Sequence, residues 1–149
     1  MILDDTLEFA DAVAANGTDA SAIVGDYHDL GASPTTRDLA AGEDCWFVVQ
    51  VVTAYASAGT SVEFQFRSST ATALTGGTTT THITTGAIST ASGIASGTTY
   101  AYRLPLGTYQ RYIGAWKVTV GAVASGTINA FITKNVPKNA IYPNAAVSS

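Results

Sequence analysis

The sequence predicts an all-β protein, a single-domain antiparallel β-sandwich of about eight strands, and three observations lead to this prediction. Apolar residues do not recur at helical spacing for more than about one turn, whereas alternation of apolar and polar residues appears repeatedly. The candidate strands are short and follow one another at the spacing expected of a sandwich. A chain of 149 residues can bury a hydrophobic core as one domain without disulfides or metals.

The first two candidate strands flank a turn signal. Leu7 to Val13 alternates in polarity, and Asp11 breaks the apolar set, which predicts an edge strand because an inward charge discourages unwanted pairing. Asn16-Gly17 fits a tight hairpin turn with positive φ. The second candidate strand runs from Ala20 to Leu30.

Two further strands are predicted to lie centrally in the fold. Cys45 to Val52 is apolar on both faces, which is typical of a central strand covered on each side. Ser61 to Ser68 places its apolar residues on one face and Glu63, Gln65 and Arg67 on the other, so one face belongs to the core.

The second half of the chain supplies the remaining strands. These are His82 to Ile88, Thr98 to Leu104, Arg111 to Val120 and Gly126 to Lys134. The segment Thr75 to Thr81, TGGTTTT, has the low complexity of a mobile loop. We expect one domain over residues 1–136 and an extended C-terminal arm over residues 137–149, because Pro137 and Pro143 exclude a central strand there.

The charges are few and sorted along the chain. Charged residues make up 12% of the sequence, against roughly 25% in an average soluble domain. Residues 1–44 carry ten acids and one base, and residues 45–149 carry one acid and six bases, giving net charges of −9 and +5. These charges are expected to be neutralised either inside one fold or between neighbouring subunits, and the sequence leaves both alternatives open.

The charge pattern and the N-terminal sequence argue against several classes of function. The acidic balance argues against direct nucleic-acid binding, since Arg103, Arg111, Lys117, Lys134 and Lys138 are too few for a coherent basic face. The chain has no run of about 20 apolar residues and no basic, apolar leader at Met1, so we expect a soluble protein made inside the cell, with no membrane partner. The single Cys45 rules out an internal disulfide.

No constellation of residues points to catalysis, a cofactor or a metal. Nucleophile-elbow, phosphate-loop and zinc-spaced motifs are missing from the sequence. Asp26 and His28 share a strand face but are too few for a metal site, and His82 has no identifiable partner. Asp44 beside Cys45 disfavours a thiolate, so a buried, inert thiol is expected. We therefore expect a protein that is not an enzyme and binds no cofactor.

Aromatic residues on the candidate strands provide an alternative function. Rings on the face of a β-sandwich can stack on sugars, so a carbohydrate- or host-surface-binding module remains open. Tyr112, Trp116, Val118 and Val120 share parity with Gly114, however, and this pattern predicts a core-facing row.

Several motifs in order resemble a known family. LPLGTYQRYIGAWKVTVG at residues 104–121, followed by ASGTINAFITK at 124–134, resembles the C-terminal half of the cement, or decoration, proteins of tailed-bacteriophage capsids. The opening MILDDTLEFADA resembles the start of those proteins, and HDLG followed by RDLAAGEDCWFVVQV resembles their next segments. The resemblance extends over nearly the whole chain.

This resemblance implies a jelly-roll fold and a structural function. Cement proteins of this kind bind the outside of an assembled capsid and tie neighbouring major-capsid subunits together. The resemblance thus implies a virion protein on the outer capsid surface, made in the host cytoplasm, with the major capsid protein and its own copies, as a homodimer or homotrimer, for partners. The residues expected at partner interfaces are Asp4, Asp5, Arg103, Arg111, Lys134, Ile141, Tyr142 and Pro143.

Overall fold

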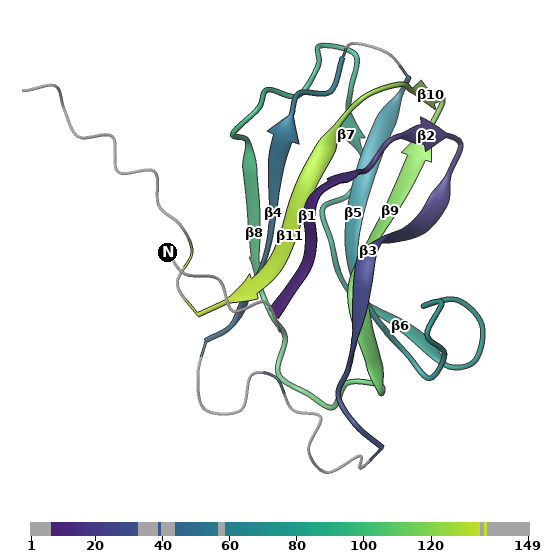
Figure 1. Cartoon of the computed structure of the whole chain (residues 1–149), viewed down its shortest axis with the longest axis vertical. Coiled ribbons are helices and arrows are strands. Elements are labelled where there is room, and N and C mark those ends of the chain that lie inside the picture. The colour runs from purple at the N-terminus through teal and green to yellow at the C-terminus, as the bar shows by residue number, and fades with distance from the viewer. Residues whose placement is uncertain (1–6, 33–38, 40–43, 57–58, 135, 137–149) are drawn as a thin grey trace, which may run out of the picture.

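The computed structural model describes residues 7–32, 39, 44–56, 59–134 and 136, and these form two antiparallel β-sheets packed face to face (Figure 1). Eleven strands lie within these residues. Eight of them are long: β1 (Glu8–Ala14), β3 (Ser21–Asp29), β4 (Trp46–Thr53), β5 (Ser61–Ser69), β6 (Thr79–Thr84), β8 (Thr99–Arg103), β9 (Tyr112–Val120) and β11 (Thr127–Thr133). The all-β prediction is confirmed.

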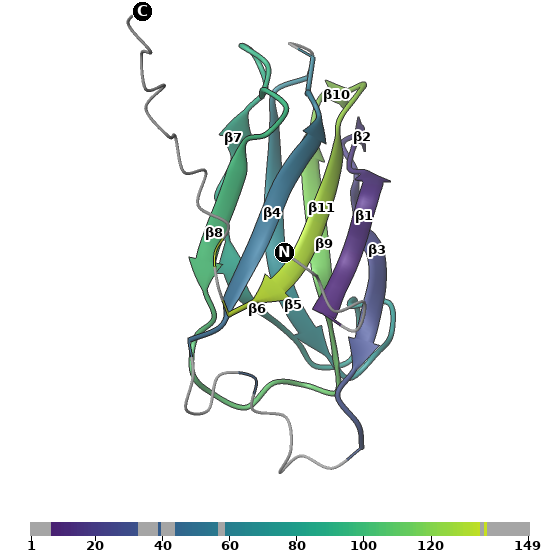
Figure 2. The same cartoon turned by 60° about the vertical axis from the view of Figure 1, so that its left-hand side comes forward.

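The long strands are connected as a jelly roll. One sheet has the order β1-β11-β4-β8 and the other β3-β9-β5-β6, as Figure 2 shows for the first of them. Numbered from one to eight along the chain, the long strands therefore run 1-8-3-6 and 2-7-4-5. Each sheet combines strands that are distant in sequence, which is the double-sheet arrangement of jelly rolls. The expected strand number is correct for these long strands.

Three two-residue strands complete the fold. They are β2 (Gly17–Thr18), β7 (Ile88–Ser89) and β10 (Ala122–Val123). β2 pairs with β10, and β7 pairs with one end of β5. Among the described residues, no helix is long and apolar enough to span a membrane.

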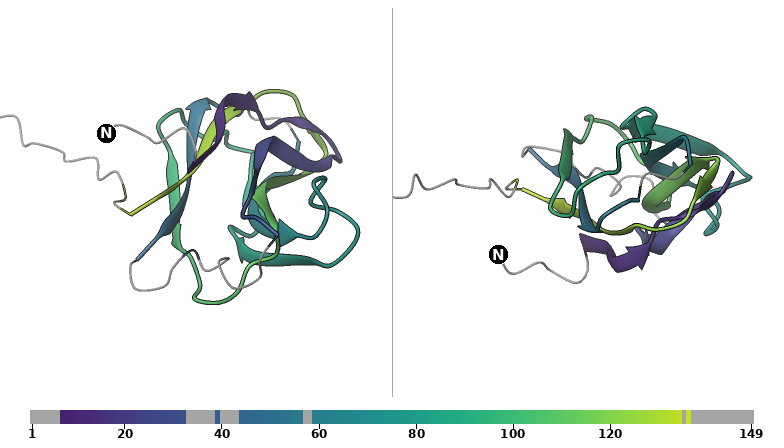
Figure 3. Two further views of the ribbon diagram at one scale, coloured as in Figure 1. Left: turned by 60° about the horizontal axis from the view of Figure 1, so that its bottom comes forward. Right: turned by 90° about the horizontal axis from the view of Figure 1, so that it is seen from above.

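The core lies between the two sheets, which Figure 3 shows as separate layers. Alternation places Val62, Phe64 and Phe66 of β5 inward, each at most 1% exposed, as the sequence predicts. Burying a side chain of this size stabilises the fold by about 1.5–3 kcal/mol. The facing sheet contributes Phe47 and Val49 of β4, which lies between β11 and β8 as a central strand.

The predicted inward face of β9 is wrong. Phe64 pairs with Lys117 and Phe66 with Ala115, so the odd-numbered residues of β9 face the core. Trp116 and the residues that share its parity face outward. The sequence misleads here because a lysine occupies an inward position: the Lys117 ammonium donates a hydrogen bond to the Asn16 carbonyl, and burial lowers the pKa of Lys117.

The connection from β1 to β3 is not a hairpin. β1 and β3 belong to different sheets, and Gly17 lies in β2 instead of at the tip of a tight turn. Two residues of this connection have positive φ: Gly17 at 145°, as predicted, and Asp19 at 44°, whose carboxylate accepts a hydrogen bond from the Gly121 amide. The predicted Asn16-Gly17 hairpin is therefore wrong, because each end of the connection pairs with a separate sheet.

The Thr-rich segment is more ordered in the fold than its composition predicts. Thr79 to Thr81 belong to β6, which begins before the predicted start at His82. Leu74 is fully buried, and its side chain lies over Gly114 on the outer face of the β3-β9-β5-β6 sheet. An apolar anchor inside a polar stretch therefore fixes this connection, and composition alone gives no sign of it.

Gly25 in β3 lies directly against the backbone of β1 in the other sheet. A Cβ atom there would lie 2.0 Å from the Phe9 carbonyl oxygen, and Gly25 has φ of 71°. We predict that Gly25→Ala lowers the free energy of unfolding by roughly 3 kcal/mol or more, since backbone strain and a steric clash both contribute. The measurement is urea denaturation followed by tryptophan fluorescence.

Gly86 provides the matched control for this substitution. It has φ of 68°, and its added Cβ would meet nothing within 4 Å. Gly86→Ala should therefore cost only the strain of a left-handed alanine, about 1–2 kcal/mol. Equal losses in the two variants would show that the close approach to Phe9 contributes nothing.

Candidate interaction surface

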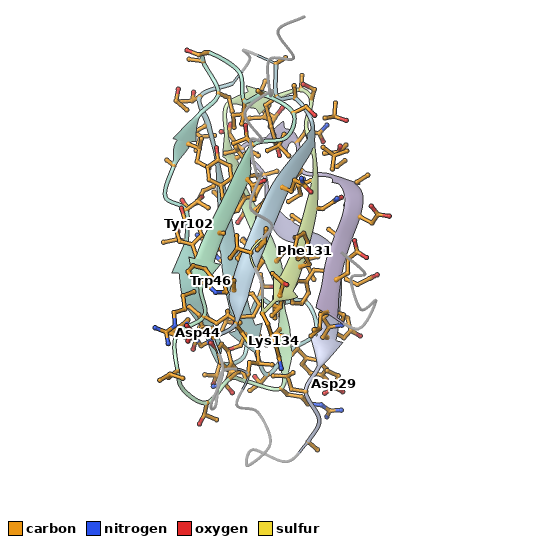
Figure 4. The ribbon with its side chains drawn as sticks, turned by 90° about the vertical axis from the view of Figure 1, so that its left-hand side faces the viewer. Asp29, Asp44, Trp46, Tyr102, Phe131 and Lys134 are labelled. Atoms are coloured by element: carbon orange, nitrogen blue, oxygen red, sulfur yellow. The ribbon has the colours of Figure 1, made fainter. Side chains whose placement is uncertain are left out.

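The structure brings three of the predicted interface residues to one end of the sandwich. We call this the lower end: the end at which β3, β8 and β11 finish and β4 and β9 begin. Arg103 is the last residue of β8, Lys134 follows β11, and Arg111 precedes β9. Figure 4 shows Lys134 at this end together with Asp29 and Asp44, the partners of the two arginines. Residues from five separate strands or their flanking segments thus share one end of the sandwich.

Arg111 is held rigidly at the lower end. Its Nε donates to Asp29 Oδ1 at 2.9 Å and its Nη2 donates to Asp29 Oδ2 at 2.7 Å, a two-pronged contact that suits the planar guanidinium. The hydrogen bonds to Asp29 raise the pKa of Arg111. Its Cζ also lies 5.0 Å from the ring centre of Tyr112. The guanidinium is therefore fixed by a carboxylate and by a ring.

Tyr27 packs against the other side of this group of contacts, next to Tyr112. Its ring packs edge-on against Tyr112, with 5.4 Å between the ring centres, and Tyr27 is 43% exposed. Both tyrosines lie on the outer face of the β3-β9-β5-β6 sheet, because Tyr27 pairs with Gly114 in the register. A fixed, exposed tyrosine beside an arginine has the composition of a protein-binding hot spot.

Arg103 forms the second ion pair of this end. Its guanidinium contacts the Asp44 carboxylate, and both side chains are more than half exposed. These two arginines, predicted to lie at partner interfaces, are thus each paired with an acid from the first third of the same chain. For these two pairs, neutralisation inside the fold is the alternative that holds.

The connection from β8 to β9, which separates Arg103 from Arg111 in the sequence, exposes an apolar side chain. Tyr109 is 2% exposed, and its hydroxyl donates to the Pro105 carbonyl at 2.6 Å, which anchors the loop. Leu106 in the same loop is 71% exposed, the largest exposure among the big apolar residues described. A shallow hollow of about 300 Å³ lies between Arg103 and Leu106.

Lys134, the third predicted interface residue at the lower end, is exposed. The other predicted interface residues are not among those that the structure describes. Asp4, Asp5, Ile141, Tyr142 and Pro143 lie outside the described residues, so their assignment stays a prediction. The sequence reasoning missed Tyr27 and Leu106. The Leu-Pro-Leu-Gly turn was the available signal for Leu106, because a turn of this type exposes its central residues.

Ser68 and His82 form a pair with the spacing of a nucleophile and its base. The Ser68 hydroxyl lies 2.7 Å from His82 Nε2, but Ser68 is fully buried and offers no access to a substrate. The His82 ring packs against Tyr109, with ring centres 4.4 Å apart. The pair is therefore a structural hydrogen bond, and it gives His82 the partner that the sequence did not reveal.

The other candidate chemical groups have structural partners. His28 Nε2 lies 3.0 Å from the Glu8 carbonyl oxygen, and its ring packs against Phe9. Within the described part of the chain, no three His, Cys, Asp or Glu side chains gather in a way that could hold a metal ion. Cys45 is buried, as predicted.

Trp116 lies on the outer face of its sheet, where a ring could stack on a sugar, but its own ring is covered. It is 5% exposed, and the Arg67 guanidinium lies over its ring, 4.4 Å from the centre. Its indole N–H donates to Ser21 Oγ at 2.9 Å. Arg67 in turn donates to Gln65 Oε1, which fixes it in this position. A sugar could reach the ring of Trp116 only by displacing Arg67.

The buried environment of His82 predicts a pH dependence of stability. Burial lowers the pKa of His82 below its ordinary value of 6.5. Below pH 6.5 the unfolded chain therefore binds a proton that the folded chain does not, so the free energy of unfolding falls as the pH decreases. This loss has a slope of at most about 1.4 kcal/mol per pH unit.

Urea denaturation between about pH 7.5 and 5.5 measures this slope. His82→Gln, which retains hydrogen-bonding groups near Ser68, should reduce the slope relative to the unsubstituted protein. An unchanged slope in the variant would show that other groups are responsible.

Comparison with known proteins identifies the family. No curated protein matches the sequence. The Bbp16 family model matches residues 9–132, which include all eight long strands except Glu8 and Thr133, as well as the loop that carries Leu106. Because this match covers most of the chain, the protein belongs to the Bbp16 family.

Proposed function

We propose that this chain is a non-enzymatic structural protein of a bacteriophage particle, which binds the outer surface of the assembled capsid and ties neighbouring major-capsid subunits together. Its partners are the major capsid protein and further copies of itself, as a dimer or trimer. It is made in the host cytoplasm and resides on the capsid surface. The resemblance of its motifs to cement proteins along nearly the whole chain supports this function.

The observation that carries the proposal is the composition of the lower end. Leu106 and Tyr27 are exposed there, and the arginines beside them are already neutralised by Asp44 and Asp29. Such a surface gains binding energy by burying apolar and aromatic area without leaving an unpaired charge behind. It therefore suits a broad protein surface better than a charged small molecule.

A cement function does not require that each individual contact bind strongly. A capsid displays many identical sites, so a protein that touches several subunits gains strength through multivalency. The jelly roll is also an architecture of viral capsid proteins, although it is shared with lectins and small-molecule-binding proteins and cannot by itself assign a function. The carbohydrate-binding alternative has less support, because Arg67 covers Trp116.

The first test is the abundance of the protein in virus particles. We expect quantitative mass spectrometry of density-gradient-purified particles to find it at a copy number comparable to that of the major capsid protein. A few copies per particle would contradict a cement function, and absence from the particles would contradict a virion function altogether.

The second test addresses the lower end. We predict that Leu106→Asp weakens binding to purified capsids at least tenfold, because a charge replaces the most exposed apolar side chain and must be desolvated on contact. Co-sedimentation with capsids that lack the protein measures the affinity.

Val120→Asp is the matched control. Val120 is also an exposed apolar residue, at 47%, but it ends β9 and therefore lies at the opposite end of the sandwich. Its variant should bind like the unsubstituted protein. Equal weakening in both variants would exclude the lower end as the specific contact surface.

A further inference from the structure

The guanidinium of Arg67 is held in one position on the outer face of the β3-β9-β5-β6 sheet. Its Nε donates to Gln65 Oε1 at 2.7 Å, and Gln65 Nε2 donates to a carboxylate oxygen of Glu63. The Thr84 hydroxyl donates to the same oxygen at 2.6 Å. Trp116 supports the guanidinium from the sheet, with its ring centre 4.4 Å from Cζ. Partners on three strands therefore fix the orientation of Arg67.

The two terminal nitrogens of Arg67 have no acceptor among the described residues. Only Nε donates a hydrogen bond, and the acid on the same strand, Glu63, is linked to it through Gln65. The other described arginines, Arg103 and Arg111, each belong to an ion pair. Burial lowers the pKa of Arg67, and the Glu63 carboxylate offsets part of this shift. A fixed guanidinium with both terminal nitrogens free is a receptor for a carboxylate, which it can bind through two hydrogen bonds.

Three acids lie along the seam between the edge strands β1 and β3. Glu8, Asp11 and Asp26 line a hollow of about 270 Å³ there. Asp11 and Asp26 are exposed, and no base among the described residues forms an ion pair with any of the three. The excess of acids in the first third of the chain therefore stays uncompensated at this seam within the part of the chain that the structure describes.

Arg67 and Asp26 stand at the same level of one sheet. Arg67 pairs with Gly114 of β9. Gly114 in turn pairs with Tyr27, which follows Asp26 in β3. Two strand spacings, about 10 Å, thus separate the strands that carry the base and the acid. Two positions on one surface exchange places under a two-fold axis that passes midway between them, so a symmetric pair of copies can make the same contact twice.

We propose that Arg67 binds the Asp26 carboxylate of a second copy of this chain, and that two copies make this contact reciprocally in a two-fold homodimer. A second copy suits Arg67 better than an unrelated acidic protein does, because one chain carries both the unpaired guanidinium and the unpaired acids. The contact specifies the self-association included in the proposed function and rests on that part of it. For these charges it selects neutralisation between subunits, the second alternative that the sequence left open.

Apolar area beside Arg67 adds affinity to the contact. Ile23 pairs with Trp116, and Val118 shares the parity of Trp116, so both side chains lie on the outer face of the sheet. Both are partly exposed. Exposed ion pairs contribute little free energy each, so the burial of apolar side chains supplies most of the affinity. The two ion pairs then determine how the copies are oriented.

Sedimentation velocity of the purified full-length chain tests this contact without capsids. We expect a monomer–dimer equilibrium in which Arg67→Glu and Asp26→Lys each raise the dissociation constant at least about tenfold, because each variant juxtaposes like charges at both contacts. An equimolar mixture of the two variants should recover dimers, since each mixed dimer retains one original contact and one with its charges exchanged. Recovery in the mixture also shows that both variants are folded.

Arg103→Glu is the matched control. It reverses an exposed arginine that is already paired with Asp44 inside the fold, so the dissociation constant should stay close to the original. Three results would overturn the proposal: a chain that is monomeric at every concentration, an Arg67→Glu variant that dimerises normally, or a mixture of the two variants that fails to recover dimers.

These outcomes are independent of capsid binding. If the mixture fails to recover dimers while purified particles contain the protein at the copy number of the major capsid protein, the self-contact is wrong and the cement function stands. If dimers form and recover as expected while the particles lack the protein, the self-contact stands and the virion function is wrong.

Discussion

The packing around Phe66 is the interaction on which the rest of the structure depends. Its ring lies 5.2 Å from that of Phe47 and 5.9 Å from that of Phe9, which belong to the opposite sheet. It also packs against Tyr109 and His82, with ring centres about 6 Å away. One fully buried ring on β5 thus joins both sheets, an edge strand and the loop between β8 and β9. Tilted and edge-on contacts of this kind add to the burial of apolar area.

This core also sets the position of the lower end. Tyr109 inserts into the aromatic cluster and holds Pro105 through its hydroxyl, so the loop that displays Leu106 is attached to the core. Arg111 follows two residues later and is fixed by Asp29 and Tyr112. An exposed side chain on an anchored loop loses little conformational freedom when it binds, and more of its contact energy remains available for affinity. The interaction surface therefore takes its rigidity from the core.

The sequence predicts the individual strands better than their arrangement. For β4 and β5, the sequence predicts both the position of the strand and which residues face the core. The pattern of each strand is unambiguous, because β4 is apolar on both faces and β5 alternates strictly between apolar and polar residues. β9 is correct in position but wrong in facing, since Lys117 occupies an inward site and Trp116 an outward one. Both exceptions depend on distant partners, the Asn16 carbonyl and the Arg67 guanidinium, which no local pattern reveals.

The same limit applies to the interaction surface. Arg103 and Arg111 were identified from the sequence, but their ion pairs join residues 59 and 82 positions apart and exist only because strands distant in the sequence are neighbours within each sheet. The sequence does not indicate that Tyr27 is exposed, since a tyrosine in an alternating strand can lie on either face. Leu74 shows the converse, as a buried apolar anchor immediately before the stretch from Thr75 to Thr81, which composition alone assigns to a mobile loop.

Arg103 connects the sheet to the lower end. It is the last residue of β8, and its ion pair with Asp44 neutralises the charge next to Leu106. Burying Leu106 against a partner therefore leaves no unpaired charge at this ion pair, and the cost of desolvating an isolated guanidinium does not arise. The fixed ion pairs at this end set the orientation of a partner, while the buried apolar area provides the affinity.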